Sequence, residues 1–422
     1  MVSRWMTLLS RIAAVPLLWP ATSRAEACPL RVTAADLPRC ALAASLDVRA
    51  QAHALAAAQQ RKNVASVALP SWPQLAVAAG VRTAAQDGGS QTGPSTAWTL
   101  GLAQEFELGG QRHARIDAAQ AGVDAEQQRA TALRPLVLAA AWTVWYQVLL
   151  RRDAWDLAQV DAAALQAVAA AVRARADKGV AALVDAEMAD AAAVDGERAR
   201  IQAEQQLREA RVDLTLILGE PADAGTDADG RLEPLAVDAT RTTIPADVLA
   251  LRAESRALIA RADAIGRSRT PNLTVSAQAQ HDRSGETAWL VGAAVPLQLP
   301  GALARNYAAE AGELQAAAQR LQVEAELLDR KWQAAMAVAR QDLTARQAEL
   351  ALYPVDRLDR ARQLLVQLAQ NVARGQLGVR DALQARQSLV GLLRGELAAR
   401  AAVCLASVEL ARRTGSLERS VP

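Results

Sequence analysis

Residues 96–110, TAWTLGLAQEFELGG, have a counterpart at residues 287–301, TAWLVGAAVPLQLPG. Both stretches open on Thr-Ala-Trp, alternate apolar with small or polar residues, and end on Leu before a glycine-containing turn. A period of two is typical of β-strands whose two faces meet different surroundings. The duplication therefore predicts two matching strands. The apolar face of the first carries Trp98, Leu100, Leu102, Phe106 and Leu108, and only Gln104 interrupts it.

Each of these strands has a partner just before it in the chain. Similar Pro-X-Leu openings at residues 73 and 271 begin two further alternating segments. We therefore expect four strands, at about 73–82, 97–108, 271–281 and 286–299. Lengths of about 9 to 13 residues suit tilted membrane-spanning strands, and a soluble sheet is the alternative. Four strands cannot close a barrel of useful bore, whereas several copies of the chain could.

Long helical segments follow each strand pair. Gln111 to Asp177 has no convincing stop, although Pro135 should bend it, and a helix over 302–373 should kink at Pro354. Each ends at a glycine turn before a returning helix, which predicts hairpins over 111–218 and 302–413. The second contains a 4-3 spacing typical of a coiled-coil seam, formed by Leu314, Ala318, Leu321, Ala325, Leu328, Trp332, Ala335 and Ala339.

Two structural repeats therefore organise the chain, over residues 26–219 and 245–415. Between them, residues 220–244 are rich in Asp, Pro, Gly and Thr and are expected to form a connecting or equatorial segment. Residues 416–422 form a short tail. The predicted fold class is mainly α with a small β part, built from two strand-strand-helix-helix halves. Neither half could bury its own faces alone.

The N-terminal region indicates export. Residues 1–25 have the positive start, apolar stretch and small residues of a signal peptide. No later stretch reaches the roughly 18 uninterrupted apolar residues of a membrane helix, so we expect no helical anchor. Cys28 and Cys40 are a candidate disulfide in an oxidising compartment. Acylation of Cys28 is the alternative, disfavoured because Glu26 stands where a small residue is expected. Cys404 is expected to be a buried, small hydrophobic residue.

Composition argues against several function classes. A net charge of +2 leaves no electrostatic footprint for nucleic acid. Aromatic residues make up only 3% of the chain, which favours Ala-rich helices packed closely through thin interfaces. No phosphate-binding glycine loop or catalytic spacing is visible, and His53, His113 and His281 are isolated. We therefore expect no enzyme, no cofactor and no metal site.

The chain resembles the TolC family of outer-membrane efflux ducts over nearly its whole mature length. It is most similar to the branch that serves heavy-metal cation exporters. The residues that support this are Glu105 to Arg112 with Arg115, which look like that branch's strand-to-helix junction, and residues 216–219 at the end of the first half. The order, spacing and duplication of these short motifs carry the resemblance, because none is specific alone.

The resemblance implies a homotrimer in the outer membrane of a Gram-negative bacterium. Three chains would form a 12-stranded transmembrane β-barrel, surrounded by outer-membrane lipid and continued by a 12-helix α-barrel across the periplasm. A periplasmic adaptor protein and an inner-membrane pump of the RND type would complete the tripartite system.

The resemblance also implies where the duct closes and docks. The periplasmic tips would be the two glycine turns, formed by Lys178, Gly179, Val180, Arg374, Gly375, Gln376 and Leu377. Asp381 would face the lumen as part of a carboxylate ring. The family often has a second carboxylate one turn later, and Gln384 occupies that position here. Asp185 would join the closing contacts, although its usual basic partner is replaced by Leu377. The alternative interpretation is that the glycines only permit left-handed turns and the charges are solvated.

The resemblance therefore implies a passive exit duct in which the pump would supply the energy, and the branch implies heavy-metal cations as the cargo. One alternative is a periplasmic coiled-coil adaptor, which usually has one helical hairpin between two compact β-rich modules, whereas this chain has two hairpins in tandem. The other is the outer-membrane duct of a protein secretion system, which would share the fold.

Overall fold

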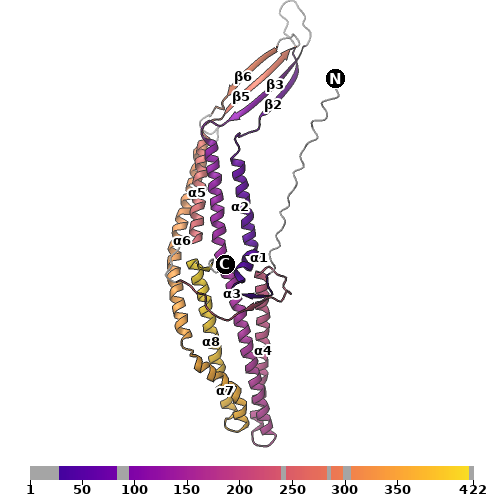
Figure 1. The fold of residues 1–422 in the computed structure, drawn as a ribbon, viewed down its shortest axis with the longest axis vertical. Helices are drawn as coiled ribbons and strands as arrows, with labels where there is room; N and C mark the ends of the chain where they lie inside the picture. Colours follow the sequence, from indigo (N-terminus) through magenta and orange to yellow (C-terminus); the bar gives the residue numbers. More distant parts are fainter. Residues whose placement is uncertain (1–27, 83–94, 239–243, 283–286, 298–305, 418–422) are drawn as a thin grey trace, which may run out of the picture.

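The computed structural model describes residues 28–82, 95–238, 244–282, 287–297 and 306–417. The molecule is elongated, with a sheet at one end and helices that run from it to two hairpin tips at the other (Figure 1). The predicted signal peptide, most of the tail, the turn after Leu297 and the expected helix start at Ala302 lie outside the described residues.

The four expected strands form one antiparallel sheet in the order β2-β3-β5-β6. Their bounds are Gln74–Arg82 for β2, Ser95–Phe106 for β3, Leu273–Asp282 for β5 and Thr287–Ala294 for β6. β6 is shorter than the predicted strand over 286–299. It ends before Pro296, because proline has no N–H to donate to the ladder.

The register brings the apolar positions of all four strands onto one face. Leu100 of β3 lies between Val77 of β2 and Ala279 of β5, and Ala279 in turn opposes Trp289 of β6. Residues directly opposite one another share a face of a sheet. Val77 is 71% exposed in the single chain, so this apolar face is uncovered. The opposite face is small or polar apart from Leu290, and carries Thr99, Gly101, Ser276, Gln278 and Gln280.

The first long helix, α3 (Gln111–Ala176), is uninterrupted and returns as α4 (Leu183–Ile217). It runs through Pro135 as one helix, whereas Pro354 breaks the second path completely. There α6 (Tyr307–Leu350) ends, and α7 (Val355–Ala373) begins directly after the proline. Proline is favoured at a helix start, where its missing N–H costs nothing. The second returning helix is α8 (Val379–Thr414).

Two shorter helices were not predicted as separate wall elements. The returning helices α4 and α8 extend along only part of their partners, and α2 (Leu46–Ala65) and α5 (Ala246–Arg267) occupy the space nearer the sheet (Figure 1). α2 packs on α3, and α5 lies between α3 and α6. Each repeat therefore consists of two strands, one long helical path and one path made of two stacked helices.

The predicted seam in the second long path lies at a packed surface. Ala318, Leu321, Ala325 and Ala339 are buried, and Leu314, Leu328, Trp332 and Ala335 are half-buried. The contacts come from α5 towards the sheet and from α8 farther away. Small residues at these positions let the helix backbones approach closely, as the Ala-rich composition predicted.

The main hydrophobic core lies halfway along the molecule. Here β1 (Arg31–Thr33) pairs in parallel with β4 (Asp227–Asp229), and both cover α3 together with α1 (Leu37–Ala44). The core centres on Trp142, Trp145 and Tyr146 of α3. The Trp145 indole donates to the carbonyl of Val32 at 2.9 Å, and the Tyr146 hydroxyl to that of Glu233 at 2.6 Å.

Among the described helices, α3 is the one that is long and apolar enough to cross a membrane. The apolar run of α3 between Arg134 and Arg151 contains the three aromatic residues of the core and several buried aliphatic ones. The run therefore packs against β1, β4 and α1, which explains its hydropathy.

Candidate functional site

Both predicted tips are helix-to-helix turns with a left-handed glycine. Gly179 has φ of 70° and Gly375 has φ of 75°, values that side chains with a Cβ rarely adopt. In each turn the residue after the glycine donates its N–H back into the preceding helix: Val180 bonds Arg175 at 2.9 Å, and Gln376 bonds Asn371 at 3.0 Å. This pattern satisfies orphan carbonyls at the helix ends.

A residue of the first tip segment to which the sequence reasoning assigned no role joins the two tips. The Arg175 guanidinium, at the end of α3, donates to the carbonyl of Val372 in the last turn of α7 at 2.7 Å. A cation at a helix C-terminus also interacts favourably with the helix dipole. Arg175 is half-buried, and a shared core that includes Val172, Leu368 and Val372 lies above it. The two hairpin tips of one chain are therefore bound to each other.

The structure places Asp185 in the first turn of α4, half-buried. Within the described residues its carboxylate has no hydrogen bond or ion pair, so Lys178, Arg374 and Arg380 do not serve as its partners inside this chain. The charges that do link α3 to α4 are those of Arg173, which forms ion pairs with Asp190 and, at 3.9 Å, with Glu187. Leu377 is partly buried against the tip core.

Asp381 and Gln384 are exposed on the first turns of α8. An acidic residue near a helix N-terminus is stabilised by the helix dipole, so Asp381 has a local structural explanation. Lys178 and Arg374 are also exposed, in the two turns themselves. The predicted tip residues thus lie together at one end of the molecule, and the single chain leaves their charged groups accessible.

A buried ion pair above the tips joins the two repeats. Asp161 of α3 is 1% exposed, and Arg386 of α8 contacts both of its carboxylate oxygens, one of them at 2.5 Å. Arg394 lies 3.6 Å away on the same helix. The sequence of α3 indicates this buried pair. Asp161 follows Ala158 by three residues and precedes Leu165 by four, a spacing at which helix seams carry apolar residues.

The residues that carry the family resemblance fasten the sheet to the helices. Arg115 forms an ion pair with Glu107 and donates to the carbonyls of Ala65 and Val67 at the end of α2. Gln111 is buried and donates to the carbonyl of Thr270 at 2.8 Å, just before β5. These contacts give the junction motif a structural role, and none of them selects a cargo.

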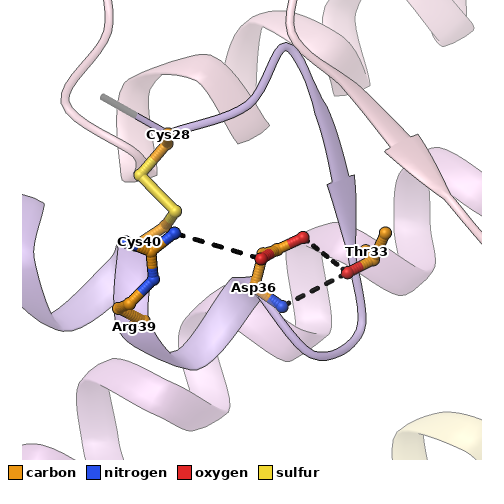
Figure 2. The surroundings of a disulfide bond; sticks show 5 residues. All are labelled: Cys28, Thr33, Asp36, Arg39 and Cys40. Atoms are coloured by element: carbon orange, nitrogen blue, oxygen red, sulfur yellow. Dashed lines mark hydrogen bonds and ion pairs between the residues drawn. A yellow bond between two sulfur atoms is a disulfide. The ribbon is translucent and has the colours of Figure 1, made fainter. Parts of the chain in front are cut away.

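The N-terminal cysteines lie against the equatorial core. The structure pairs Cys28 with Cys40 in a disulfide between the start of the described chain and α1 (Figure 2). Asp36 closes the loop between them, because its carboxylate accepts a hydrogen bond from Thr33 at 2.6 Å. A sulfur held in a disulfide cannot also carry a thioether-linked lipid. Cys404 is a free thiol, fully buried in α8.

Aromatic residues mark both ends of the apolar sheet face. Trp98 and Trp289 lie toward the end of the sheet far from the helices, and Trp289 is 80% exposed. Phe106 ends β3 near the helices, and Trp72, just before β2, is 91% exposed. Trp98 and Phe106 are about 27 Å apart along the strand at the usual rise per residue. Such spacing matches the apolar band of about 25 Å of an outer-membrane barrel.

Comparison with known proteins agrees with this geometry. Residues 37–220 match the family model described as Outer membrane efflux protein. The fold is similar to that of the outer membrane protein VceC from Vibrio cholerae, with a TM-score of 0.72 and 18% identity over 90% of this chain and 95% of that one. A membrane protein from Pseudomonas aeruginosa has a TM-score of 0.70 and 18% identity over 90% of this chain and 91% of that one. CusC has a TM-score of 0.62 and 17% identity, again over 90% of this chain and 91% of that one. The search of curated protein sequences found no match.

The chain is therefore similar to TolC-like outer membrane efflux proteins in its fold and, over residues 37–220, in its sequence. The predicted fold class, mainly helical with a small antiparallel sheet, is confirmed. The two helical hairpins in tandem and the single four-stranded sheet differ from the one hairpin between two β-rich modules that a periplasmic adaptor would have. Identities of 17–18% to these structures do not separate one branch of the family from another.

Proposed function

We propose that three copies of this chain form the outer-membrane exit duct of a tripartite efflux system. The observation that carries the proposal is the four-stranded sheet, which has an uncovered apolar face, a small or polar face, and two edge strands, β2 and β6. In hydrocarbon every backbone N–H and C=O needs a partner, so an isolated four-stranded sheet cannot span a membrane. Pairing β6 of one copy with β2 of the next removes both edges and encloses the polar face.

The helices then continue the wall toward the inner membrane. In the proposed assembly the apolar side chains exposed on α4, such as Val194 and Ile201, pack against a neighbouring copy, as do Leu364 and Val366 on α7. The lumen is passive, because nothing in the described chain supplies energy. An RND-type pump and a periplasmic adaptor provide transport and docking, and the adaptor meets the tip turns around Lys178–Val180 and Arg374–Leu377.

The same turns form the gate in this proposal. Within one chain Arg175 binds the two hairpins together. Around the threefold axis, Asp185 and the ring of Asp381 carboxylates face charged groups of neighbouring copies that hold the duct closed. Three carboxylates near one axis concentrate negative potential and attract cations. Gln384 leaves that ring with one carboxylate per chain instead of two.

Planar-bilayer conductance tests the gate. Arg175→Gln removes the bond to Val372 and should raise closed-state conductance, because the two hairpins lose their direct link. Asp185→Ala, and Lys178→Gln combined with Arg374→Gln, should also change closed-state conductance. Arg208→Gln is the matched control, since among the described residues Arg208 pairs only with Glu204 of its own helix α4. Wild-type conductance in every tip variant would contradict the gate.

Heavy-metal cations are the proposed cargo class, on the strength of the junction motif from Glu105 to Arg112 with Arg115. Cells that lack this chain should become sensitive to divalent transition-metal cations and keep their tolerance of organic drugs. Sensitivity to organic drugs with unchanged tolerance of these cations would place the chain in another branch of the family. Loss of a secreted protein instead would favour the secretion-duct alternative.

A further inference from the structure

A wide polar cavity lies at the junction between the sheet and the helices. Its volume is about 810 Å³, and it is lined by the first turns of α3 and α6 and the last turns of α5. This volume falls within the range of about 300 to 1,000 Å³ that is typical of small-molecule sites. The lining residues Gly110 and Arg269 each lie four positions from a strand, after Phe106 and before Leu273 respectively. The cavity therefore begins where the apolar band of the sheet ends.

The cavity carries charges of both signs. Arg267 and Arg269 contribute two positive charges, and Asp117 and Asp263 contribute two negative ones. Arg267, Asp117 and Asp263 are exposed, and among the described residues their side chains form no hydrogen bond or ion pair with one another or with any other group. The surrounding wall is made of small residues, including Ala114, Ala260, Ala308 and Gly312. The lining leaves space between the charges rather than filling it.

The cavity faces the outside of the duct, an inference that rests on the proposed function. Asp117 lies four heptads from Trp145 on α3, and residues separated by whole heptads share a face of a helix packed in a left-handed wall. At Trp145 that face is covered by β1 and by the segment around Gly230 that connects α4 to α5; Arg152 donates a hydrogen bond to the carbonyl of Gly230 at 2.8 Å. This connecting segment would obstruct the duct if it lay inside the lumen, so this face of α3, and the cavity on it, look outward.

We propose that this cavity binds the headgroup of a zwitterionic phospholipid from the periplasmic leaflet of the outer membrane. Arg267 and Arg269 bind the phosphate, and Asp117 and Asp263 bind the ammonium group of an ethanolamine headgroup. The acyl chains extend from the cavity over the apolar sheet face. The two carboxylates among the described lining residues disfavour a purely anionic headgroup, because its second anionic or neutral group would leave them unpaired.

Native mass spectrometry on the protein extracted from outer membranes and then stripped of lipid tests the proposal. The sample is titrated with phosphatidylethanolamine, with phosphatidylglycerol and with inorganic phosphate. We expect one phosphatidylethanolamine per chain, bound about fivefold or more tightly than phosphatidylglycerol, as two partly exposed ion pairs would give. Asp117→Asn with Asp263→Asn should abolish that preference, and Arg267→Gln with Arg269→Gln should weaken both lipids. Glu326→Gln with Arg330→Gln, on exposed charges of α6 outside the cavity, is the matched control and should bind like wild type.

Equal or tighter binding of phosphatidylglycerol by the wild type would overturn the proposal, as would wild-type binding by both cavity variants. Displacement of the lipid by inorganic phosphate at the same concentration would identify a free-anion site instead. Bilayer conductance is recorded on the same wild-type sample. A conducting protein without lipid preference contradicts only the lipid site, whereas a protein that binds the lipid but does not conduct contradicts only the duct.

Discussion

At the scale of single residues, the buried carboxylate of Asp161 is a polar link between the two repeats. Removing one partner of a buried ion pair leaves the other charge uncompensated. We expect Asp161→Asn to lower the free energy of unfolding by about 3 kcal/mol, measured by denaturant unfolding in detergent. Asp359→Asn is the control, because its pair with Arg362 is more than half exposed and should be worth about 0.5 kcal/mol or less.

A double replacement separates the charge from the packing. Asp161→Leu with Arg386→Met substitutes an apolar pair for the ionic one, and such swaps are often neutral or stabilising. Recovery of most of the lost stability would show that the single variant suffers from an unpaired charge. If Asp161→Asn unfolds like the wild type, the ion pair does not hold α3 to α8.

The three cysteines should differ sharply in reactivity. Burial raises the pKa of the Cys404 thiol to about 12, so at pH 8 almost none of it is the reactive thiolate. The folded protein should therefore resist iodoacetamide at pH 8. After unfolding without reductant one thiol should react, and after reduction all three should react, because Cys28 and Cys40 form the disulfide. A lipid-sized mass on Cys28, or two reactive thiols without reductant, would contradict that pairing.

At the scale of elements, the two faces of the sheet should respond oppositely to charge. Leu100 lies on the apolar face near the middle of β3, where an arginine facing lipid costs about 2 to 4 kcal/mol. Leu100→Arg should therefore block assembly into the outer membrane, assayed as the amount of folded protein in purified outer membranes. Gln278→Arg is the matched control, since Gln278 opposes Gly101 on the other face and should be tolerated. Equal loss in both variants would contradict the assignment of faces.

The strands and the long helices were the elements that sequence could predict, because both have strong periods. The alternation around Trp98 and Trp289 predicted two strands and their apolar face, and a glycine with positive φ stands at each predicted tip. Strand ends were less certain, as β6 shows by stopping before Pro296. The stacking of α2 and α5 was not predicted, because the helical period alone does not say onto which returning helix a short helix will stack.

Long-range side-chain links were beyond the sequence reasoning for a related reason. Arg175 binds Val372 and Arg386 binds Asp161, and each pair is about two hundred residues apart in the chain. The repeat predicted that two hairpins exist but not which of their faces meet. Only the polar residue at a seam position of α3 pointed to one of these links, because a carboxylate there needs a buried partner.

At the scale of the whole molecule, the free sheet edges and the uncovered apolar face support the proposed association with further copies of the chain. The extended shape, with the sheet at one end and both tips at the other, suits a wall element that reaches from the outer membrane into the periplasm (Figure 1). One chain provides the four strands of this sheet, so the proposed barrel, lumen and carboxylate ring would exist only in an assembly of several copies. The central claim is therefore about how many copies associate, and where.

The most direct test is the native mass of the particle extracted in mild detergent from purified outer membranes. The account predicts a particle of three chains in that fraction and none in the soluble periplasm. A soluble monomer or dimer in the periplasm would contradict the duct, because a single sheet with two open edges could not then span the outer membrane.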